Sequence, residues 1–231
     1  HGGVVDVKRS HSGGNTHLGM LMLLVPLAAG AGMCVARGEG FYLDLRGNVR
    51  FIVENTSVND ALGLYDAILV SEAGGLGGHD LDVRREESAG RLVSEGISFY
   101  ELMRLSADRD MVARELVDGM GVVFNVAYPT FSNIFRKSGD VRSSIVQTFL
   151  VVLSRFPDTL IARKTADVKA RRVSEYALSV LECGGVFTEE GRVELEEFSG
   201  YLRGAGNKLN PGTTADIVAA TTFLWLLNNQ F

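Results

Sequence analysis

The chain enters its last apolar segment through a stretch of small and polar residues, Asn207-Lys208-Leu209-Asn210-Pro211-Gly212-Thr213-Thr214-Ala215-Asp216. A second stretch with a similar pattern is Asp158-Thr159-Leu160-Ile161-Ala162-Arg163-Lys164. In each stretch, an aspartate and small polar residues occupy positions that are typical of a helix start. The two stretches therefore predict a helical protein with chemically active side chains at helix starts.

Helical periodicity recurs along most of the rest of the chain. Ser57 and Asp60 suit a helix start, and Ser98 and Glu101 have the spacing of a capping box. Strand-like alternation is scarce, and a short hairpin over residues 41–53 is the one alternative. We therefore predict an all-α multi-helix bundle in a single compact domain. The expected helices cover residues 18–34 with a kink at Pro26, 57–74, 98–119, 128–137, 141–155, 159–182, 189–203 and 214–228.

Composition narrows the class of protein. The 231 residues are 46% hydrophobic, and the net charge of −5 argues against a broadly basic nucleic-acid-binding surface. Cys34 and Cys183 are the only cysteines, so neither a disulfide framework nor a zinc site is expected. The apolar run 18–36 contains Pro26 and several glycines, which favours a core helix over a membrane span. We expect a cytoplasmic protein with no membrane partner.

Two aspartates are candidates for chemistry, and each has a structural alternative. Asp216 lies three residues after Thr213, the spacing of a capping box, and Asp158 stands where an N-cap would stand. Asp80 and Asp82 alternate in a glycine-rich loop, where they suit either a divalent cation or a turn. His17, at a helix start, suits phosphate contact or proton transfer, or a structural hydrogen bond.

Phosphate binding would need cations and free backbone amides gathered in one place. Arg163 and Lys164 are adjacent on a predicted helix, so their side chains point about 100° apart and only one of them needs to face a ligand. The helix starts at residues 12–16 and 211–214 suit close approach of backbone N–H groups to phosphate, although glycine there more often marks a turn.

Three blocks resemble signatures of the triphosphoribosyl-dephospho-CoA synthase family. Asn15-Thr16-His17-Leu18-Gly19 is similar to that family's Asn-Thr-His-Lys-Gly, with leucine in place of lysine. Asp158-Thr159 with Lys164 resembles its Asp-Thr block, and Asn210 to Asp216 resembles its Ser-Pro-Gly-Gly-Ser-Ala-Asp block. Gly75-Leu76-Gly77-Gly78 replaces its Ala-Arg-Gly-Glu, and its upstream Lys-Pro-Gly segment is missing. We therefore expect a divergent branch, not the citrate-lyase type itself, lacking the N-terminal family segment.

The resemblance implies transfer of a triphosphoribosyl group from ATP to a ribose hydroxyl of dephospho-CoA, with release of adenine. Paired carboxylates are the usual means in glycosyl chemistry, so Asp158 and Asp216 are the expected pair, with His17 as a further catalytic candidate. Mg²⁺ is expected with ATP, and its candidate ligands are Asp158, Asp216, Asp80 and Asp82. The candidate residues for binding the nucleotide and the CoA-like molecule are Asn15, Thr16, Thr159, Arg163, Lys164, Asn210, Gly212, Thr213 and Thr214.

Two other functions stay open at this stage. One keeps the nucleotide pocket but performs phosphoryl or amide-forming chemistry on another phosphorylated cofactor precursor. The other is a helical binding or assembly protein without catalysis. The segments 144–153 and 221–227 contain more apolar residues than one buried helix face requires. The excess suits either a homodimer interface or a crowded monomer core.

Overall fold

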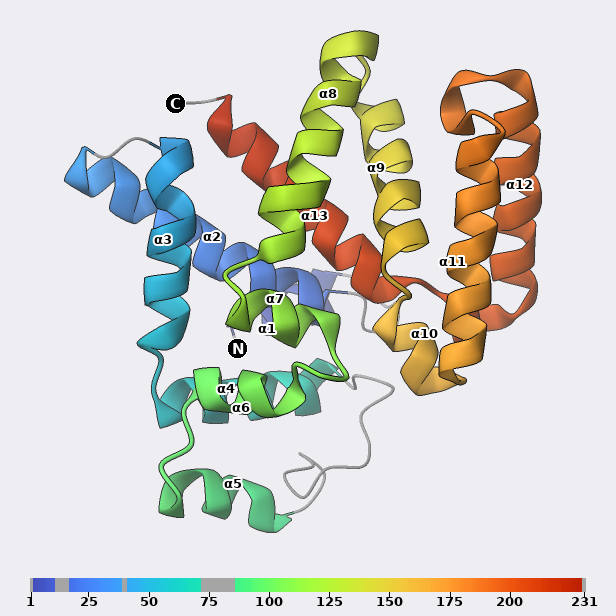
Figure 1. The fold of residues 1–231 in the computed structure, drawn as a ribbon. Coiled ribbons are helices and arrows are strands. Elements are labelled where there is room, and N and C mark those ends of the chain that lie inside the picture. The colour runs from blue at the N-terminus through green and yellow to red at the C-terminus, as the bar shows by residue number, and fades with distance from the viewer. Residues whose placement is uncertain (1, 11–16, 39–40, 72–85, 230–231) are drawn as a thin grey trace. The chain divides into compact units, whose positions relative to one another are not determined.

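The computed structural model describes residues 2–10, 17–38, 41–71 and 86–229, and all regular structure within these ranges is helical (Figure 1). The predicted all-α class is therefore confirmed. Contacts divide the chain into two compact units, His1–Met120 and Gly121–Phe231, and each is described by itself. The single domain over residues 1–231 stays a prediction.

The first unit is built around the packing of α2 on α3. Gly30 makes a close approach possible, because a Cβ at that position would lie 3.0 Å from Val49 Cγ2. Asn48 reaches the same contact and donates through Nδ2 to the buried Cys34 Sγ at 3.2 Å. The helices of this unit are α1 (Gly2–Ser10), α2 (Leu18–Arg37), α3 (Phe41–Glu54), α4 (Val58–Ser71), α5 (Glu86–Ser94), α6 (Phe99–Ser106) and α7 (Met111–Val117).

Two expectations for this unit were wrong. Residues 41–53 form α3 and no hairpin, because Leu45, Val49 and Val53 recur every four residues and build one buried helical face. The expected helix over 98–119 is two helices. Ser98 and Glu101 do form the predicted capping box of α6, but Asp110 starts a new helix by accepting hydrogen bonds from the backbone N–H groups of Val112 and Ala113.

Helix α2 is the apolar run that raised the question of a membrane span. By length and composition it is suited to cross a membrane, with a mean hydropathy of 2.1 over its best window. A core helix or a signal sequence passes the same test, so this is weak evidence for a span. The helix continues through Pro26, which is buried.

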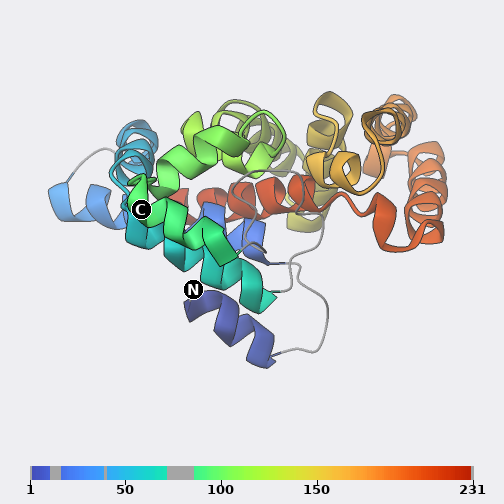
Figure 2. The same ribbon diagram turned by 90° about the horizontal axis from the view of Figure 1, so that it is seen from below.

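The second unit contains a core of buried residues from α9, α10, α11, α12 and η3, among them Leu150, Ile161, Val173 and Phe198. Helix α13 packs against α8, α9 and α10, and Figure 2 shows it running along one side of α8 and α9. The elements are η1 (Val123–Ala127), α8 (Tyr128–Ser138), α9 (Val141–Arg155), α10 (Thr159–Lys164), α11 (Asp167–Glu182), η2 (Gly185–Phe187), α12 (Glu189–Gly204), η3 (Gly206–Leu209) and α13 (Gly212–Asn228).

The expected helix over 159–182 is also two helices. Thr165 ends α10 by donating its hydroxyl to the carbonyl oxygen of Ile161 at 2.7 Å, and Ala166 is extended before α11 begins. Side-chain hydroxyls that bond to the preceding turn compete with helix continuation. The break leaves α10 as a short helix of six residues that carries Arg163 and Lys164.

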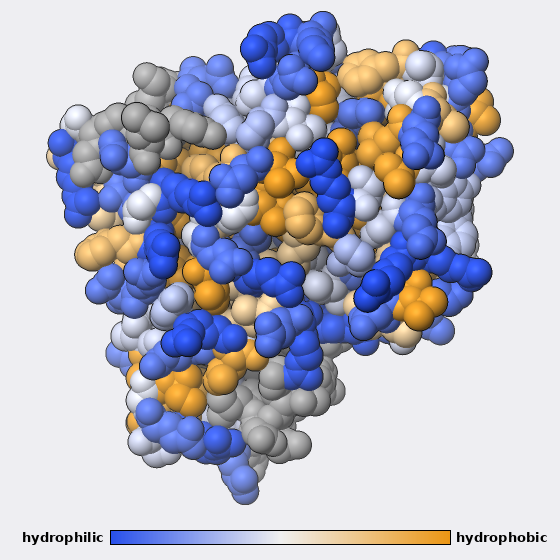
Figure 3. All heavy atoms as spheres, viewed as in Figure 1, coloured by the Kyte–Doolittle hydropathy of each residue, from blue (hydrophilic) through white to orange (hydrophobic). Residues whose placement is uncertain are grey.

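The apolar excess over residues 144–153 and 221–227 is largely taken up inside this unit. Leu150, Leu153 and Leu224 are fully buried, and the ring of Trp225 packs 4.6 Å from that of Phe135 between centroids. On the face drawn in Figure 3, hydrophobic side chains form scattered patches among hydrophilic ones. These observations suit the crowded core, and the homodimer stays a prediction.

Two glycines of α12 give opposite expectations for replacement by alanine. A Cβ at Gly191 would collide with the backbone of Gly185 in η2, whereas a Cβ at Gly200 would meet nothing within 4 Å. We expect Gly191→Ala to lower the free energy of unfolding by about 2 kcal/mol through overpacking. Gly200→Ala should raise it by about 0.5–1 kcal/mol, because alanine loses less backbone entropy in a helix. Urea denaturation of both variants measures the difference, and equal stabilities would contradict the packing of η2 on α12.

Candidate active site at the junction of two helix starts

The carboxylate of Asp158 connects the first turn of α10 to the first turn of α13. Its Oδ1 accepts hydrogen bonds from the backbone N–H groups of Leu160 at 2.9 Å and Ile161 at 3.1 Å. Its Oδ2 accepts from the backbone N–H of Thr214 at 2.8 Å and from the Thr214 hydroxyl at 2.9 Å. One side chain thus satisfies donors of two helices whose sequences lie 56 residues apart.

Asp158 is fully buried, with 0% of its surface exposed. Burial raises the pKa of its carboxyl, while the N–H donors of Thr214, Ile161 and Leu160 and the Thr214 hydroxyl act in the opposite direction. The N-cap interpretation of Asp158 is confirmed. Both oxygens already accept two hydrogen bonds each, so this arrangement suits a residue that positions α10 and α13 better than one that binds Mg²⁺ or a proton donor.

The start of α13 differs from the expectation in position and in capping. The helix begins at Gly212, not at Thr214, and its N-cap is Pro211, which provides no side-chain cap. The capping-box interpretation of Thr213 and Asp216 is therefore wrong, because Asp158 of another helix supplies the acceptor. The Gly212 N–H donates to the Asn210 carbonyl oxygen at 2.9 Å. Two of the backbone donors proposed for phosphate are thus used inside the protein.

Further contacts join the two sequence blocks. The hydroxyl oxygens of Thr159 and Thr213 lie 3.2 Å apart, and Lys164 donates through Nζ to the Asn207 carbonyl oxygen at 3.2 Å. A Cβ at Gly212 would lie 2.6 Å from Leu160 Cδ2, so glycine allows the two starts to approach closely. The two stretches that carry the expected pair, Asp158 and Asp216, are therefore in direct contact.

Asp216 lies one turn into α13. Residues three and four apart share a helix face, so Asp216 lies on the same face of α13 as Thr213 and Gly212, the residues that contact α10. Its side chain is half-buried, in contrast to Asp158. Of the predicted carboxylate pair, Asp216 is the member whose setting leaves it accessible for a ligand. Arg163 on the neighbouring helix is exposed, and Lys164 is half-buried.

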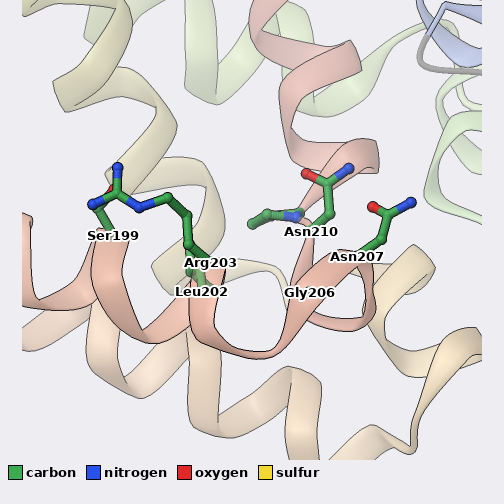
Figure 4. A pocket seen from close by; sticks show the side chains of 7 residues that line it. Ser199, Leu202, Arg203, Gly206, Asn207 and Asn210 are labelled. Atoms are coloured by element: carbon green, nitrogen blue, oxygen red, sulfur yellow. The ribbon is translucent and has the colours of Figure 1, made fainter. Parts of the chain in front are cut away.

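A hollow of about 450 Å³ lies beside this junction (Figure 4). It opens between the end of α12, η3 and the residues that precede α13, and Figure 4 shows the amide groups of Asn207 and Asn210 extending to the same side. Arg203 reaches back along α12 towards Ser199 (Figure 4). The residues that line the hollow are Ser199, Leu202, Arg203, Gly206, Asn207, Asn210 and Pro211.

Of the lining residues, Asn210 was predicted from the sequence as a binding candidate, and Asn207 and Pro211 were indicated only as parts of the stretch around the helix start. Ser199, Leu202 and Arg203 belong to the last turns of a helix that looked like ordinary amphipathic surface. The glycines at 204 and 206, which interrupt this helix and begin η3, were the available signal that the chain turns back here. These glycines lie directly before the Asn207–Asp216 stretch, so a hollow formed where the chain turns back would lie next to that stretch.

The remaining predicted residues lie in the first unit. His17 directly precedes α2 and is half-buried, as expected for a residue at a helix start. Asn15, Thr16, Asp80 and Asp82 lie outside the described residues, as does the glycine-rich block 75–78. Among the residues that the structure does describe, no group of three or more His, Cys, Asp or Glu side chains is arranged to hold a metal ion.

The described residues form an all-α protein with a polar junction between two helix starts, and comparison with known proteins gives the family. The family model for ATP:dephospho-CoA triphosphoribosyl transferase, CitG, matches residues 2–231. The chain therefore belongs to the CitG family.

Relatives and a solved structure agree with this assignment. The 2-(5''-triphosphoribosyl)-3'-dephosphocoenzyme-A synthase of Klebsiella pneumoniae is 26% identical over 95% of the chain and 63% of its own length. A candidate synthase of the same kind from Acinetobacter calcoaceticus is 26% identical over 51% of the chain and 39% of its own length. The chain thus spans less than two thirds of either curated relative. A crystal structure described as a candidate triphosphoribosyl-dephospho-CoA synthase from Archaeoglobus fulgidus is 26% identical, with a TM-score of 0.69 over 92% of this chain and 83% of that one.

The double role of Asp158 predicts an unusual sensitivity to asparagine. Asparagine has a single acceptor oxygen, so in Asp158→Asn one of the two helix starts would face an NH₂ group. We expect a loss of about 2 kcal/mol in the free energy of unfolding, because buried N–H donors lose their acceptor. Asp140 is the matched control, since it caps only α9 through the Ser143 N–H and is exposed. Asp140→Asn should cost less than about 0.5 kcal/mol. Equal losses in thermal denaturation would show that the bridge to α13 contributes nothing.

Proposed function

We propose that this protein transfers a triphosphoribosyl group from ATP to dephospho-CoA and releases adenine. The family match over residues 2–231 supports the proposal. The structural observation that carries it is that the contact through Asp158 and Thr214 packs α13, which carries Asp216, against α10, which carries Arg163 and Lys164. Two stretches expected to act together thus form one junction.

In this reaction the bond between the ribose C1 of ATP and adenine breaks, and a bond from C1 to the acceptor hydroxyl oxygen forms. The hydroxyl proton leaves, and the departing adenine takes up a proton, so the atoms balance. Positive charge develops on the ribose ring in between, and a nearby carboxylate stabilises it. We assign this role to Asp216, which is half-buried on the face of α13 that follows Thr213.

The other residues of the junction bind and position. Asp158 holds the starts of α10 and α13 together and so fixes Asp216 relative to Arg163 and Lys164. Thr159 and Thr213 offer hydroxyl groups beside this contact, and Arg163 or Lys164 supplies positive charge for the triphosphate. His17, Asn15 and Thr16 stay predictions of the sequence for the same reaction.

Mg²⁺ is proposed to accompany the triphosphate. This ion keeps several waters and takes one or two protein carboxylates together with phosphate oxygens. We propose Asp216, whose side chain is half-buried, as a single ligand of this kind. The oxygens of the buried Asp158 accept four hydrogen bonds. When bound, the ion neutralises part of the charge of the triphosphate.

We further infer a branch of the family that departs from the citrate-lyase type. Leu18 in place of lysine and Gly75 to Gly78 in place of a charged block support this inference. A cytoplasmic location and a homodimer remain predictions of the sequence.

Incubation of the protein with ATP, Mg²⁺ and dephospho-CoA tests the function directly. Free adenine that forms only in the presence of dephospho-CoA is the expected result. Release of ADP or AMP would support phosphoryl or amide-forming chemistry instead. Absence of both nucleotide turnover and nucleotide binding would leave a non-catalytic helical protein.

Asp216→Asn separates catalysis from capping. The change keeps the shape of the side chain but removes its charge, so we expect adenine release to fall by roughly 10²-fold or more. The free energy of unfolding should change by less than about 1 kcal/mol, because asparagine has nearly the same size as the half-buried aspartate. Asp167→Asn, an exposed aspartate in the first turn of α11, is the control and should keep its turnover. Near wild-type rates in Asp216→Asn would remove this residue from the mechanism.

A further inference from the structure

We propose that the hollow beside η3 binds the uncharged pantetheine arm of dephospho-CoA and so forms the acceptor's own subsite. The proposal rests on the proposed function and extends it, because it gives donor and acceptor different places. The hollow measures about 450 Å³ and is open, with Arg203, Gly206, Asn207 and Asn210 exposed along it, so it suits an extended arm lying along its floor.

The hydrogen-bonding groups of the hollow match those of the arm. Pantetheine carries two amide groups and a hydroxyl, each able to donate and to accept hydrogen bonds. Asn207 and Asn210 offer primary amides of the same dual character, and Figure 4 shows them extending to the same side. Leu202 and Pro211 add apolar surface for the methyl and methylene groups of the arm.

The charge of the hollow argues against the triphosphate as its occupant. Arg203 is the one charged residue in the lining, and its guanidinium already donates to the Glu196 carboxylate at 2.9 Å. A triphosphate needs several cations or Mg²⁺ around it. The ammonium group of Lys164 lies on the Asn207 carbonyl oxygen, on the side of α10. Arg203 is thus the single charged side chain of the lining, and the hollow offers mainly neutral groups.

The position of the hollow connects it to the proposed chemistry. Asn210 and Pro211 line it and directly precede α13, whose second turn carries Asp216. We place the nucleotide end of the acceptor at Asn210 and Pro211, so that an arm held in the hollow leaves that end near the start of α13. Dephospho-CoA carries its reacting hydroxyl at that nucleotide end.

Filling the hollow tests the assignment. Ser199 is a half-buried lining residue of α12, so Ser199→Trp should occupy part of the hollow. Val193, on the same helix, is 54% exposed and does not line it, so Val193→Trp is a control of equal bulk. Calorimetric titration with dephospho-CoA should give a Kd at least about tenfold higher in Ser199→Trp, the equivalent of about 1.4 kcal/mol. The Kd for ATP should stay within about twofold in both variants, since one tryptophan in the hollow does not reach α10.

A second variant and a shorter ligand keep the test independent of folding. Asn210→Leu preserves the size of an exposed side chain but removes its amide, and it should also weaken dephospho-CoA binding. ADP, which lacks the arm, should bind wild type, Ser199→Trp and Asn210→Leu equally. Unchanged dephospho-CoA binding in both variants would overturn the subsite, and a loss of ATP or ADP affinity would assign the hollow to the nucleotide instead. Failure of wild type to release adenine refutes the proposed reaction, whereas these binding ratios judge the subsite separately.

Discussion

The carboxylate of Asp158 satisfies the first turns of two helices, and the site-bearing part of the second unit depends on this bridge. Helix α13 brings no side-chain cap of its own, since Pro211 stands at its N-cap. The acceptor for its third residue comes instead from the start of α10. The spacing of Asp216, Arg163 and Lys164 therefore follows from one buried side chain. A buried carboxylate is costly unless hydrogen-bonded, and the four donors offset that cost.

This bridge also limits how phosphate can be recognised. Free N–H groups at a helix start are the usual anion site, but the N–H groups of Gly212 and Thr214 have acceptors inside the protein. Phosphate binding at this junction must then rely on side chains or on Mg²⁺. The chain has a net charge of −5, so the positive charges of Arg163 and Lys164 matter more for phosphate binding here than they would at a site with free backbone N–H groups.

Local sequence predicted the helices well and their interruptions poorly. The four-residue repeat of Leu45, Val49 and Val53 is typical of a helix, but the β-branched residues around it also suit a strand. At the breaks before Asp110 and after Lys164, the polar side chains of Asp110 and Thr165 make hydrogen bonds with the backbone, and apolar periodicity does not predict such bonds. The N-cap at Asp158 was predictable from its neighbours. Its bond to Thr214 was not, because it depends on packing between segments 56 residues apart.

In the signature blocks of the CitG family, some residues are explained by the fold and others are not. Resemblance in the Asp158 block and the Asn210–Asp216 block has a structural explanation, since a contact that holds two helix starts together requires these residue types. Asp158, Thr214 and Gly212 are explained in this way without any substrate. Asp216 is different, because it does not belong to the Asp158 bridge and lies half-buried one turn beyond it. The case for chemistry at this junction therefore rests on Asp216 and the neighbouring cations, while Asp158 acts through the geometry it imposes on them.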